Sequence, residues 1–305
     1  MRRPDPLPVR AEPVEAPLLL LGRVRAARRR AALRQAQGEP TWFGVRHIIL
    51  ALALVATPVV AAADRYADAR RTMVEKIRAG IREASPQADD DGLERVLNVV
   101  STIPRERFVA DAAKPYAYLT TPLEIGYGQT ISDPYIVTLM TAAARLPADA
   151  NVLDIGTGSG YQAAVLSPLA RSVWSVEIVE PLAKQAGARL RRLGYRNVTV
   201  RAGDGFAGWP DKAPFDAIIV AAGAATIPQP LIDQLKVGGR MIIPIGPSTA
   251  QELLLVVKKR ADGTLDRCSL GGIMFVPLTG AGERPTTLRG LRDRSIRQCY
   301  DAPVT

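Results

Sequence analysis

The sequence has little of the chemistry that many enzymes use, since it contains one histidine and two cysteines among 305 residues. The single histidine, His47, lies in the N-terminal leader, which we take as residues 1–63. A Ser-His-Asp triad, a histidine-based metal site and an imidazole base are therefore excluded from the rest of the chain. Cys268 and Cys299 form no C-x-x-C pair, so neither a zinc knuckle nor a redox motif is expected, and no metal site is predicted. We expect two unrelated thiols, because a disulfide between them would require an oxidising compartment.

A long hydrophobic run is also missing. The uncharged stretch Ile48–Ala63 is shorter than the ~20 apolar residues that a membrane span needs. Its basic flank at Arg46-His47 and its small-residue end before Asp64 are typical of a secretory signal peptide. Residues 1–44 are rich in proline, alanine and arginine, and we assign them no fold. A signal normally stands at the very start of a protein, so we consider a mis-assigned start as the explanation of these residues. The alternative for the apolar stretch is an N-terminal anchor or a docked hydrophobic helix.

The charge is unevenly distributed. The formal net charge is +10, and residues 1–47 alone contain ten arginines and four acidic residues. Because most of the excess lies in the leader, a solvated or targeting segment is favoured over a nucleic-acid surface. The remaining length suffices for one sizeable domain with appendages.

A short apolar strand runs into three glycines at alternate positions in the sequence VLDIGTGSGY, residues 152–161. Glycines at this spacing allow a tight turn and let backbone N–H groups approach a ligand closely. The third glycine comes one residue too early for the dinucleotide fingerprint G-x-G-x-x-G. The acidic form D-x-G-x-G-x-G resembles motif I of methyltransferases that use S-adenosylmethionine, a cofactor with an ammonium and a sulfonium group.

Strands and helices are predicted to alternate after the glycine loop. This order indicates a doubly wound, mostly parallel seven-stranded α/β sheet with antiparallel edge strands and an N-terminal helical extension. We divide the chain into the leader 1–63, a helical and substrate-loop region 64–146, a cofactor-binding catalytic domain 147–280 and a polar, poorly packed tail 281–305. The predicted helices cover residues 66–81, 91–103, 134–140, 162–169, 181–193 and 231–235, and the predicted strands cover residues 152–155, 173–178, 198–201, 215–220, 240–245, 252–259 and 272–276.

Acidic residues follow three of the predicted strands. Asp154 ends the first, Glu177 ends the second, and Asp204 follows the third in Gly203-Asp204-Gly205. Because ligands of open α/β sheets bind outside the carboxyl ends of the strands, we expect all three near the cofactor. Glu177 is expected to accept hydrogen bonds from the ribose hydroxyls, and Asp204 is expected to accept one from an adenine amino group.

Upstream, the run GYGQTISDPY at residues 126–135 leads into a helix that Ser132 or Asp133 could cap. This run, with several downstream elements, resembles the protein-L-isoaspartate O-methyltransferase family over roughly residues 91–280. The other matching elements are IPRERFV at 103–109, Ala117-Tyr118, YQAAVL at 161–166, Gly203-Asp204-Gly205, PFDAIIV at 214–220, LIDQL at 231–235 with Gly238-Gly239, and VPLT at 276–279.

The resemblance implies a Rossmann-like methyltransferase fold and a reaction. A methyl group passes from S-adenosylmethionine to the free α-carboxylate of an L-isoaspartyl residue in a damaged protein, with D-aspartyl residues as a second candidate acceptor. The ester then closes to a succinimide that reopens partly to normal aspartate. A carboxylate is already nucleophilic, so no base is needed and catalysis is mostly positioning. Ser132 maps onto the family's active-site serine, and Thr130 is expected to assist it. The expected cofactor-binding residues are Asp154, Gly156, Thr157, Gly158, Gly160, Glu177, Asp204 and Gly205.

Four residues depart from the family pattern, namely Thr120, Glu124, Asp133 and Thr138, where Asp, Pro, Gln and Ala are usual. Asp133 matters most, because it adds a negative charge beside a site that holds a carboxylate. Two alternatives stay open: a methyltransferase-fold enzyme with another acceptor, and a non-catalytic exported binding module. A nucleic-acid methyltransferase is disfavoured because no Asn/Asp-Pro-Pro-Tyr/Phe motif follows residue 220. We expect a monomer that acts on proteins and peptides, without nucleic acid and without a membrane span beyond the leader. The compartment is left open, since the cofactor supply favours the cytoplasm and the leader favours export.

Overall fold

The structure is a computed structural model that describes residues 66–84, 90–247, 249–258, 262–281 and 296–299. The chain divides into two compact units, residues 1–64 and 65–305. The first unit, and with it the predicted signal, lies outside the described residues. The division of residues 64–146 from residues 147–280 stays a prediction; one hydrophobic cluster includes both Met73 and Leu253.

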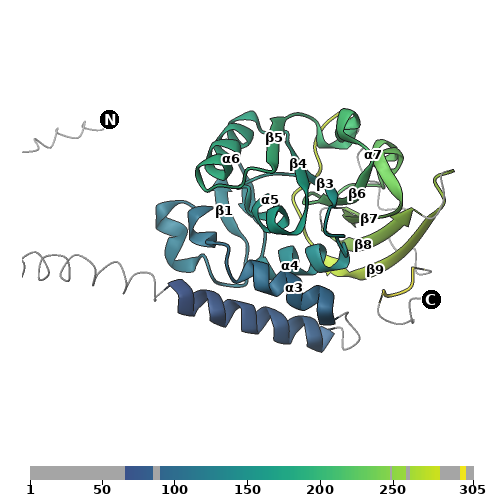
Figure 1. Ribbon diagram of the computed structural model, residues 1–305. Coiled ribbons are helices and arrows are strands. Elements are labelled where there is room, and N and C mark those ends of the chain that lie inside the picture. Colours follow the sequence, from purple (N-terminus) through teal and green to yellow (C-terminus); the bar gives the residue numbers. More distant parts are fainter. Residues whose placement is uncertain (1–65, 85–89, 248, 259–261, 282–295, 300–305) are drawn as a thin grey trace, which may run out of the picture. The chain divides into compact units, whose positions relative to one another are not determined.

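A seven-stranded sheet forms the centre of the second unit, in the order β5-β4-β3-β6-β7-β8-β9 (Figure 1). The first five strands in this order run parallel, and β8 and β9 continue the sheet antiparallel, as predicted. Their bounds are β3 Asn151–Ile155, β4 Ser172–Glu177, β5 Val198–Ala202, β6 Phe215–Val220, β7 Leu235–Ile245, β8 Gln251–Lys258 and β9 Leu265–Ile273.

Helices cover both faces of the sheet because its central strands are apolar on both sides. In β6, Ala217 and Ile219 join one hydrophobic cluster, while Ile218 and Val220 join the other. The first cluster contains residues of α3, α4 and α5, and the second contains residues of α7. The helices are a helix over residues 66–84, α3 Asp90–Val100, α4 Pro134–Ala143, α5 Tyr161–Leu166, α6 Glu180–Arg192 and α7 Gln229–Gln234, with short 3-10 turns η1 Arg105–Arg107, η2 Asp111–Tyr116, η3 Ser167–Leu169, η4 Gly205–Ala207 and η5 Pro210–Lys212.

Two predictions about strands were wrong. The segment before α4, which we expected to be a loop, forms a two-stranded antiparallel hairpin of β1 (Leu123–Gly126) and β2 (Gln129–Ile131). The last strand lies at Leu265–Ile273 and not at residues 272–276. Charged residues such as Asp266 and Arg267 hide this edge strand from an apolar pattern, and residues 276–278 leave the sheet to bond with Gly223 instead.

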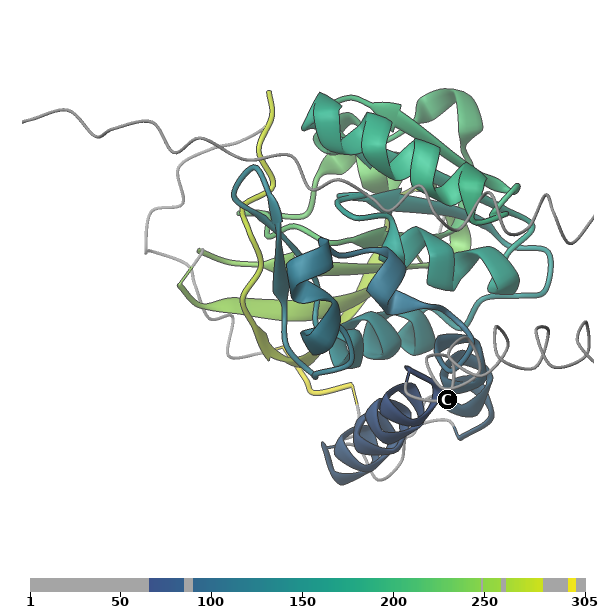
Figure 2. The same cartoon turned by 90° about the vertical axis from the view of Figure 1, so that its left-hand side faces the viewer.

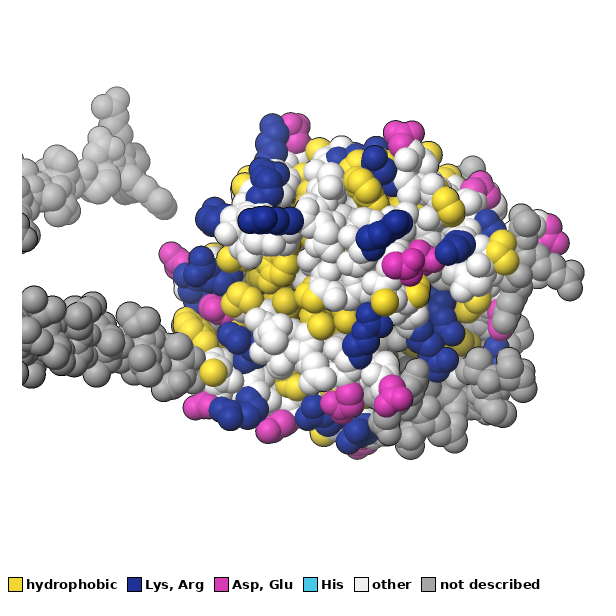
Figure 3. Space-filling model, viewed as in Figure 1, with side chains coloured by type: hydrophobic (Ala, Val, Ile, Leu, Met, Phe, Trp, Pro, Cys, Tyr) yellow, Lys and Arg dark blue, Asp and Glu magenta, His cyan; other side chains and the backbone are white. Residues whose placement is uncertain are grey.

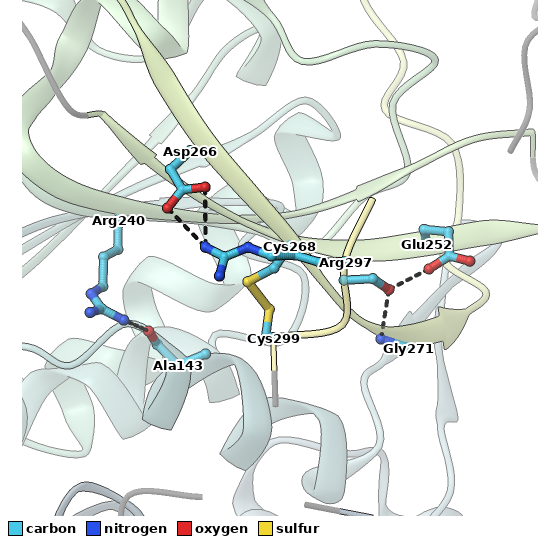
Figure 4. Close-up of a disulfide and its surroundings, with 9 residues drawn as sticks. Ala143, Arg240, Glu252, Asp266, Cys268, Gly271, Arg297 and Cys299 are labelled. Atoms are coloured by element: carbon cyan, nitrogen blue, oxygen red, sulfur yellow. Dashed lines mark hydrogen bonds and ion pairs between the residues drawn. A yellow bond between two sulfur atoms is a disulfide. The ribbon is translucent and has the colours of Figure 1, made fainter. Parts of the chain in front are cut away.

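The prediction of two unrelated thiols was also wrong, because Cys268 and Cys299 form a disulfide (Figure 4). Residues 296–299 return to β9, where Ser269 N donates to Arg297 O and Cys299 N donates to Ser269 O, both at 2.9 Å. Arg297 also pairs with Asp266 at 3.0 Å (Figure 4). This part of the tail is therefore packed, contrary to our expectation. The separation of 31 residues hid the pairing, since only the return of the chain to β9 brings the thiols together.

We predict that the double substitution Cys268→Ser/Cys299→Ser lowers the free energy of unfolding by about 3 to 4 kcal/mol, because a loop of 31 residues gains conformational freedom in the unfolded chain. Denaturant unfolding measures this loss. A reductant should lower the stability of the natural chain to that of the variant and leave the variant unchanged. Equal stability of the oxidised and reduced natural chain would contradict the prediction.

Candidate active site

A pocket opens at the carboxyl ends of β3, β4 and β6, where open α/β sheets bind their ligands. The hairpin β1–β2 and the segment after β9 complete its walls. The residues that line it are Gln129, Thr130, Ile131, Ser132, Val137, Ile155, Gly156, Thr157, Gly158, Ser159, Tyr161, Gln162, Val176, Glu177, Ile178, Gly205, Ala221, Ala222, Val276, Pro277, Leu278 and Thr279.

The glycine loop between β3 and α5 forms the floor of the pocket. Gly156, Gly158 and Gly160 have φ angles of 89°, 51° and 89°, which side chains other than glycine rarely adopt. Gly156 and Gly158 line the pocket, whereas Gly160 lies behind it. A β-carbon on Gly160 would lie 3.1 Å from Leu190 Cδ1, so this glycine lets α6 pack closely. The loop therefore presents backbone to a ligand and not side chains.

Glu177 holds this loop in place from the end of β4. Its Oε2 accepts a hydrogen bond of 2.7 Å from Gly158 N, and its Oε1 accepts one of 2.9 Å from Val179 N. The side chain is buried and still lines the pocket. Each carboxylate oxygen has a further lone pair, so Glu177 can also accept from ligand hydroxyls.

Asp154 lies beneath the loop and does not line the pocket. It is fully buried; Ser175 Oγ donates to its Oδ2 at 2.7 Å, and Ser175 Oγ contacts Thr157 Oγ1 at 2.5 Å. Its Oδ1 makes no hydrogen bond to any described residue. Burial, opposed by the bond from Ser175 and assisted by the charge of Glu177, raises the pKa of Asp154 to about 7. Asp154 is therefore connected to Thr157, which lines the pocket, through hydrogen bonds of Ser175.

Asp204 and Gly205 follow β5, and only Gly205 lines the pocket. Asp204 Oδ1 accepts from Phe206 N, and its Oδ2 accepts from Ala281 N, both at 2.8 Å. In this structure both carboxylate oxygens of Asp204 thus bind backbone. Gly205 leaves no room for a side chain, because a β-carbon there would lie 2.5 Å from Ile155 Cγ2.

Ser132 and Thr130 lie on the opposite wall, at the end of the hairpin. Ser132 is half-buried and Thr130 is exposed, and neither hydroxyl bonds to another described residue. The next residue, Asp133, caps α4 by accepting 2.7 Å from Tyr135 N. Burial raises the pKa of Asp133, against the opposing effects of that bond and of Arg105. Its carboxylate is thus directed to the helix, and Asp133 is not among the lining residues.

The segment Val276–Thr279 also lines the pocket, although our sequence analysis assigned it no role in the site. Gly223 N donates to Val276 O at 2.8 Å, and Leu278 N donates to Gly223 O at 2.7 Å. The side-chain amide of Gln251 bonds the backbone of Phe275 through both its atoms, at 2.7 and 3.2 Å. The signal of the segment Val276–Thr279 in the sequence is the run VPLT, which is too short to predict where the segment lies in the fold. Within the described residues no cluster of histidine, cysteine or acidic side chains could hold a metal ion.

The chain is similar to one family of known proteins. Residues 88–283 match the family model described as protein-L-isoaspartate(D-aspartate) O-methyltransferase. A protein-L-isoaspartate O-methyltransferase 2 of Syntrophobacter fumaroxidans is 50% identical over 236 residues, covering 76% of this chain and 95% of the relative. One of a Polaromonas species is 52% identical over 209 residues, covering 68% and 99%.

Solved structures agree with these sequences. A protein-L-isoaspartate O-methyltransferase superposes with a TM-score of 0.60 at 29% identity, covering 69% of this chain and 66% of the other. A structure from Plasmodium falciparum, described as such an enzyme in complex with S-adenosyl-L-homocysteine, gives a TM-score of 0.58 at 25% identity, covering 69% and 98%. The mostly parallel seven-stranded fold predicted from the sequence is confirmed.

The buried carboxyl of Asp154 predicts a pH dependence of stability. Its pKa is raised from 3.8 to about 7, so the folded chain keeps a proton that the unfolded chain releases. Stability should therefore fall by about 1.4 kcal/mol per pH unit as pH rises between the two pKa values. Asp154→Asn cannot ionise and should lack this component. Urea unfolding of both proteins across the window measures the difference between their curves, and parallel curves would contradict the prediction.

Proposed function

As the chain belongs to the protein-L-isoaspartate O-methyltransferase family, we propose that this pocket is its active site and that Ser132 and Thr130 hold the acceptor. The chain is an S-adenosylmethionine-dependent enzyme that methylates isoaspartyl residues in proteins. Its relatives favour this function over a diverged acceptor and over a binding module.

The pocket residues fit S-adenosylmethionine. The loop Gly156–Gly158 is a cradle without side-chain bulk, and a β-carbon on Gly156 would lie 3.4 Å from Ala221 O. We propose that Glu177 accepts from the ribose hydroxyls, and that Ile178 and Leu278 supply apolar surface for the base. This site is shaped by Asp154, Gly156, Thr157, Gly158, Gly160 and Gly205. Asp204 accepts a hydrogen bond from Ala281 N and so fixes the chain just after the segment Val276–Thr279. When bound, the cofactor supplies an electrophilic methyl group on a sulfonium.

In the proposed reaction, Ser132 orients the acceptor carboxylate. Its hydroxyl can donate to an α-carboxylate, and the hydroxyl of Thr130 offers a second donor at the pocket mouth. No group has to remove a proton, because the acceptor is ionised at neutral pH. Ser132 and Thr130 would hold the acceptor oxygen in line with the methyl group that bound S-adenosylmethionine would supply, at about 3 to 3.5 Å. The observation that carries the proposal is that two residues with hydroxyl groups, Ser132 and Thr130, line one pocket with the glycine loop, and that neither hydroxyl bonds to a described residue.

Methyl transfer from labelled S-adenosylmethionine to an isoaspartyl peptide tests the function, with the normal aspartyl peptide as control. We expect labelling of the isoaspartyl peptide alone. Equal labelling of both peptides, or none by the folded chain, would contradict the assigned reaction.

For Ser132→Ala we predict a fall in kcat of at least about tenfold, the loss of one charge-assisted hydrogen bond worth roughly 1.5 kcal/mol or more. The affinity for S-adenosylmethionine should stay nearly unchanged, because Ser132 belongs to the acceptor wall. Calorimetry and steady-state kinetics separate the two effects. Ser101→Ala, at the exposed end of α3, serves as the control. Unchanged turnover of the Ser132 variant would remove Ser132 from the acceptor site.

We also propose that the chain acts as a monomer on polypeptides and not on nucleic acids. Lys and Arg gather over α6, but side chains of both signs alternate over the rest of that face (Figure 3). None of the described helices combines the length and the apolar character that a membrane crossing demands.

The stretch at residues 48–63 is proposed to act as a secretion signal. The disulfide Cys268–Cys299 supports export, because such bonds persist in oxidising compartments, whereas the supply of cofactor favours the cytoplasm. N-terminal sequencing of the protein from fractionated cells decides the matter. A mature start near residue 64 in an extracytoplasmic fraction supports the proposal, and an intact leader in the cytoplasm refutes it.

A further inference from the structure

The hairpin β1–β2 lies over the cofactor loop with one of its two faces. A β-carbon on Gly158 would lie 3.3 Å from Ile125 Cδ1 and 3.9 Å from Thr130 O. Leu123 pairs with Ile131, whose side chain is buried. Since side chains alternate along a strand, the face that carries Ile125 covers the loop, and Thr130 stands on the other face, at the rim of the pocket that it lines. Figure 2 shows the hairpin at the edge of the molecule.

Glu124 lies on the outward face, directly opposite Thr130 in the antiparallel register. Side chains of such a pair share one face, with β-carbons about 4.5 to 5.5 Å apart. Both residues are exposed. Glu124 forms no ion pair with any described residue, and it stands beside Thr130, whose hydroxyl is one of the two proposed to hold the acceptor.

Tyr127 stands at the tip of the same hairpin. It has a φ of 56°, between Gly126 at 91° and Gly128 at 68°. A non-glycine residue in this region costs about 1 kcal/mol, and the ring gains no burial in return, since it is 57% exposed. Tyr127 lies three residues from Thr130, so the Cα atoms of these two residues are at most about 10 Å apart. An exposed aromatic ring on a strained turn beside a substrate pocket is suited to contact with a ligand.

We propose that the outer hairpin surface, formed by Glu124, Tyr127 and Thr130, binds the polypeptide on either side of the isoaspartyl residue, and that Glu124 selects a lysine or arginine there. The inference rests on the proposed function of the pocket. An extended substrate advances about 3.3 Å per residue, so Tyr127 reaches a residue two or three positions from the isoaspartate. The continuity of this surface with Thr130 and Ser132 in the pocket identifies the occupant as the substrate polypeptide.

Charge decides the preferred neighbour. The acceptor is itself an anion, and Glu124 repels it. A cationic neighbour in the substrate pairs with Glu124 and removes that repulsion, whereas an acidic neighbour adds to it. Exposed pairs of this kind are weak and are screened by salt, so the preference should be several-fold and should shrink at high ionic strength.

The test measures kcat/KM for three isoaspartyl peptides that differ only in having Lys, Gln or Glu beside the isoaspartate. For the natural chain at low salt we expect the Lys peptide to exceed the Glu peptide by about fivefold. Glu124→Gln should reduce this ratio to about twofold or less, and Glu124→Lys should invert it. High salt should reduce the ratio of the natural chain in the same way.

Asp149→Asn provides the matched control. It removes one exposed negative charge at the opposite end of the parallel strands, two residues before β3, and should leave the ratio unchanged. An unchanged Lys-to-Glu ratio in Glu124→Gln would overturn the proposal. Methylation of the Gln peptide by every variant confirms that the reaction itself is intact; failure with all three peptides would overturn the proposed function and this inference with it.

Tyr127→Asn tests the tip of the hairpin independently, because asparagine tolerates a positive φ. We expect the KM for the Gln peptide to rise about threefold or more, with the KM for S-adenosylmethionine unchanged. Val237→Asn, a similarly exposed apolar position near the start of β7, should change neither constant. An unchanged peptide KM in Tyr127→Asn would remove Tyr127 from the surface.

Discussion

The site depends on the hydrogen bond from Gly158 N to Glu177 at 2.7 Å. This bond fixes a loop whose three glycines adopt φ angles that other residues avoid, and it connects the ends of β3 and β4. Ile125 of the hairpin packs against the same glycine. The cofactor loop, the carboxylate proposed to bind the ribose and the acceptor wall thus meet at one backbone group, which suits a reaction that needs alignment and no proton transfer.

Most of the fold could be predicted because its signals are local. The apolar run of β6 is one continuous segment of the sequence, and so is the glycine loop. These two segments determine where the parallel sheet lies. The hairpin, β9 and the disulfide could not be predicted in this way. Each depends on a partner that is polar, very short or distant along the chain: β1 and β2 have four and three residues, and Cys268 and Cys299 are separated by 31.

The candidate site was predictable as a set of strand ends, but the role of each acid was not. Glu177 lines the pocket, whereas Asp154 is buried below the loop and Asp204 binds backbone at Phe206 and Ala281. A position at the end of a strand indicates that a carboxylate is near the ligand. The burial and the hydrogen-bond partners of that carboxylate determine whether it contacts the ligand. The wall at Val276–Thr279 comes from beyond the sheet, so no strand-end rule could find it.

The proposed reaction requires that this pocket align an acceptor carboxylate on Ser132 with a cofactor on the glycine loop. A crystal structure of the full chain with S-adenosyl-L-homocysteine and an isoaspartyl peptide tests this alignment most directly. We expect the α-carboxylate within hydrogen-bond distance of Ser132 Oγ, the cofactor sulfur facing it, and the flanking peptide along the outer hairpin surface. A carboxylate bound away from Ser132, or a cofactor away from Gly156 and Glu177, would contradict the proposed alignment.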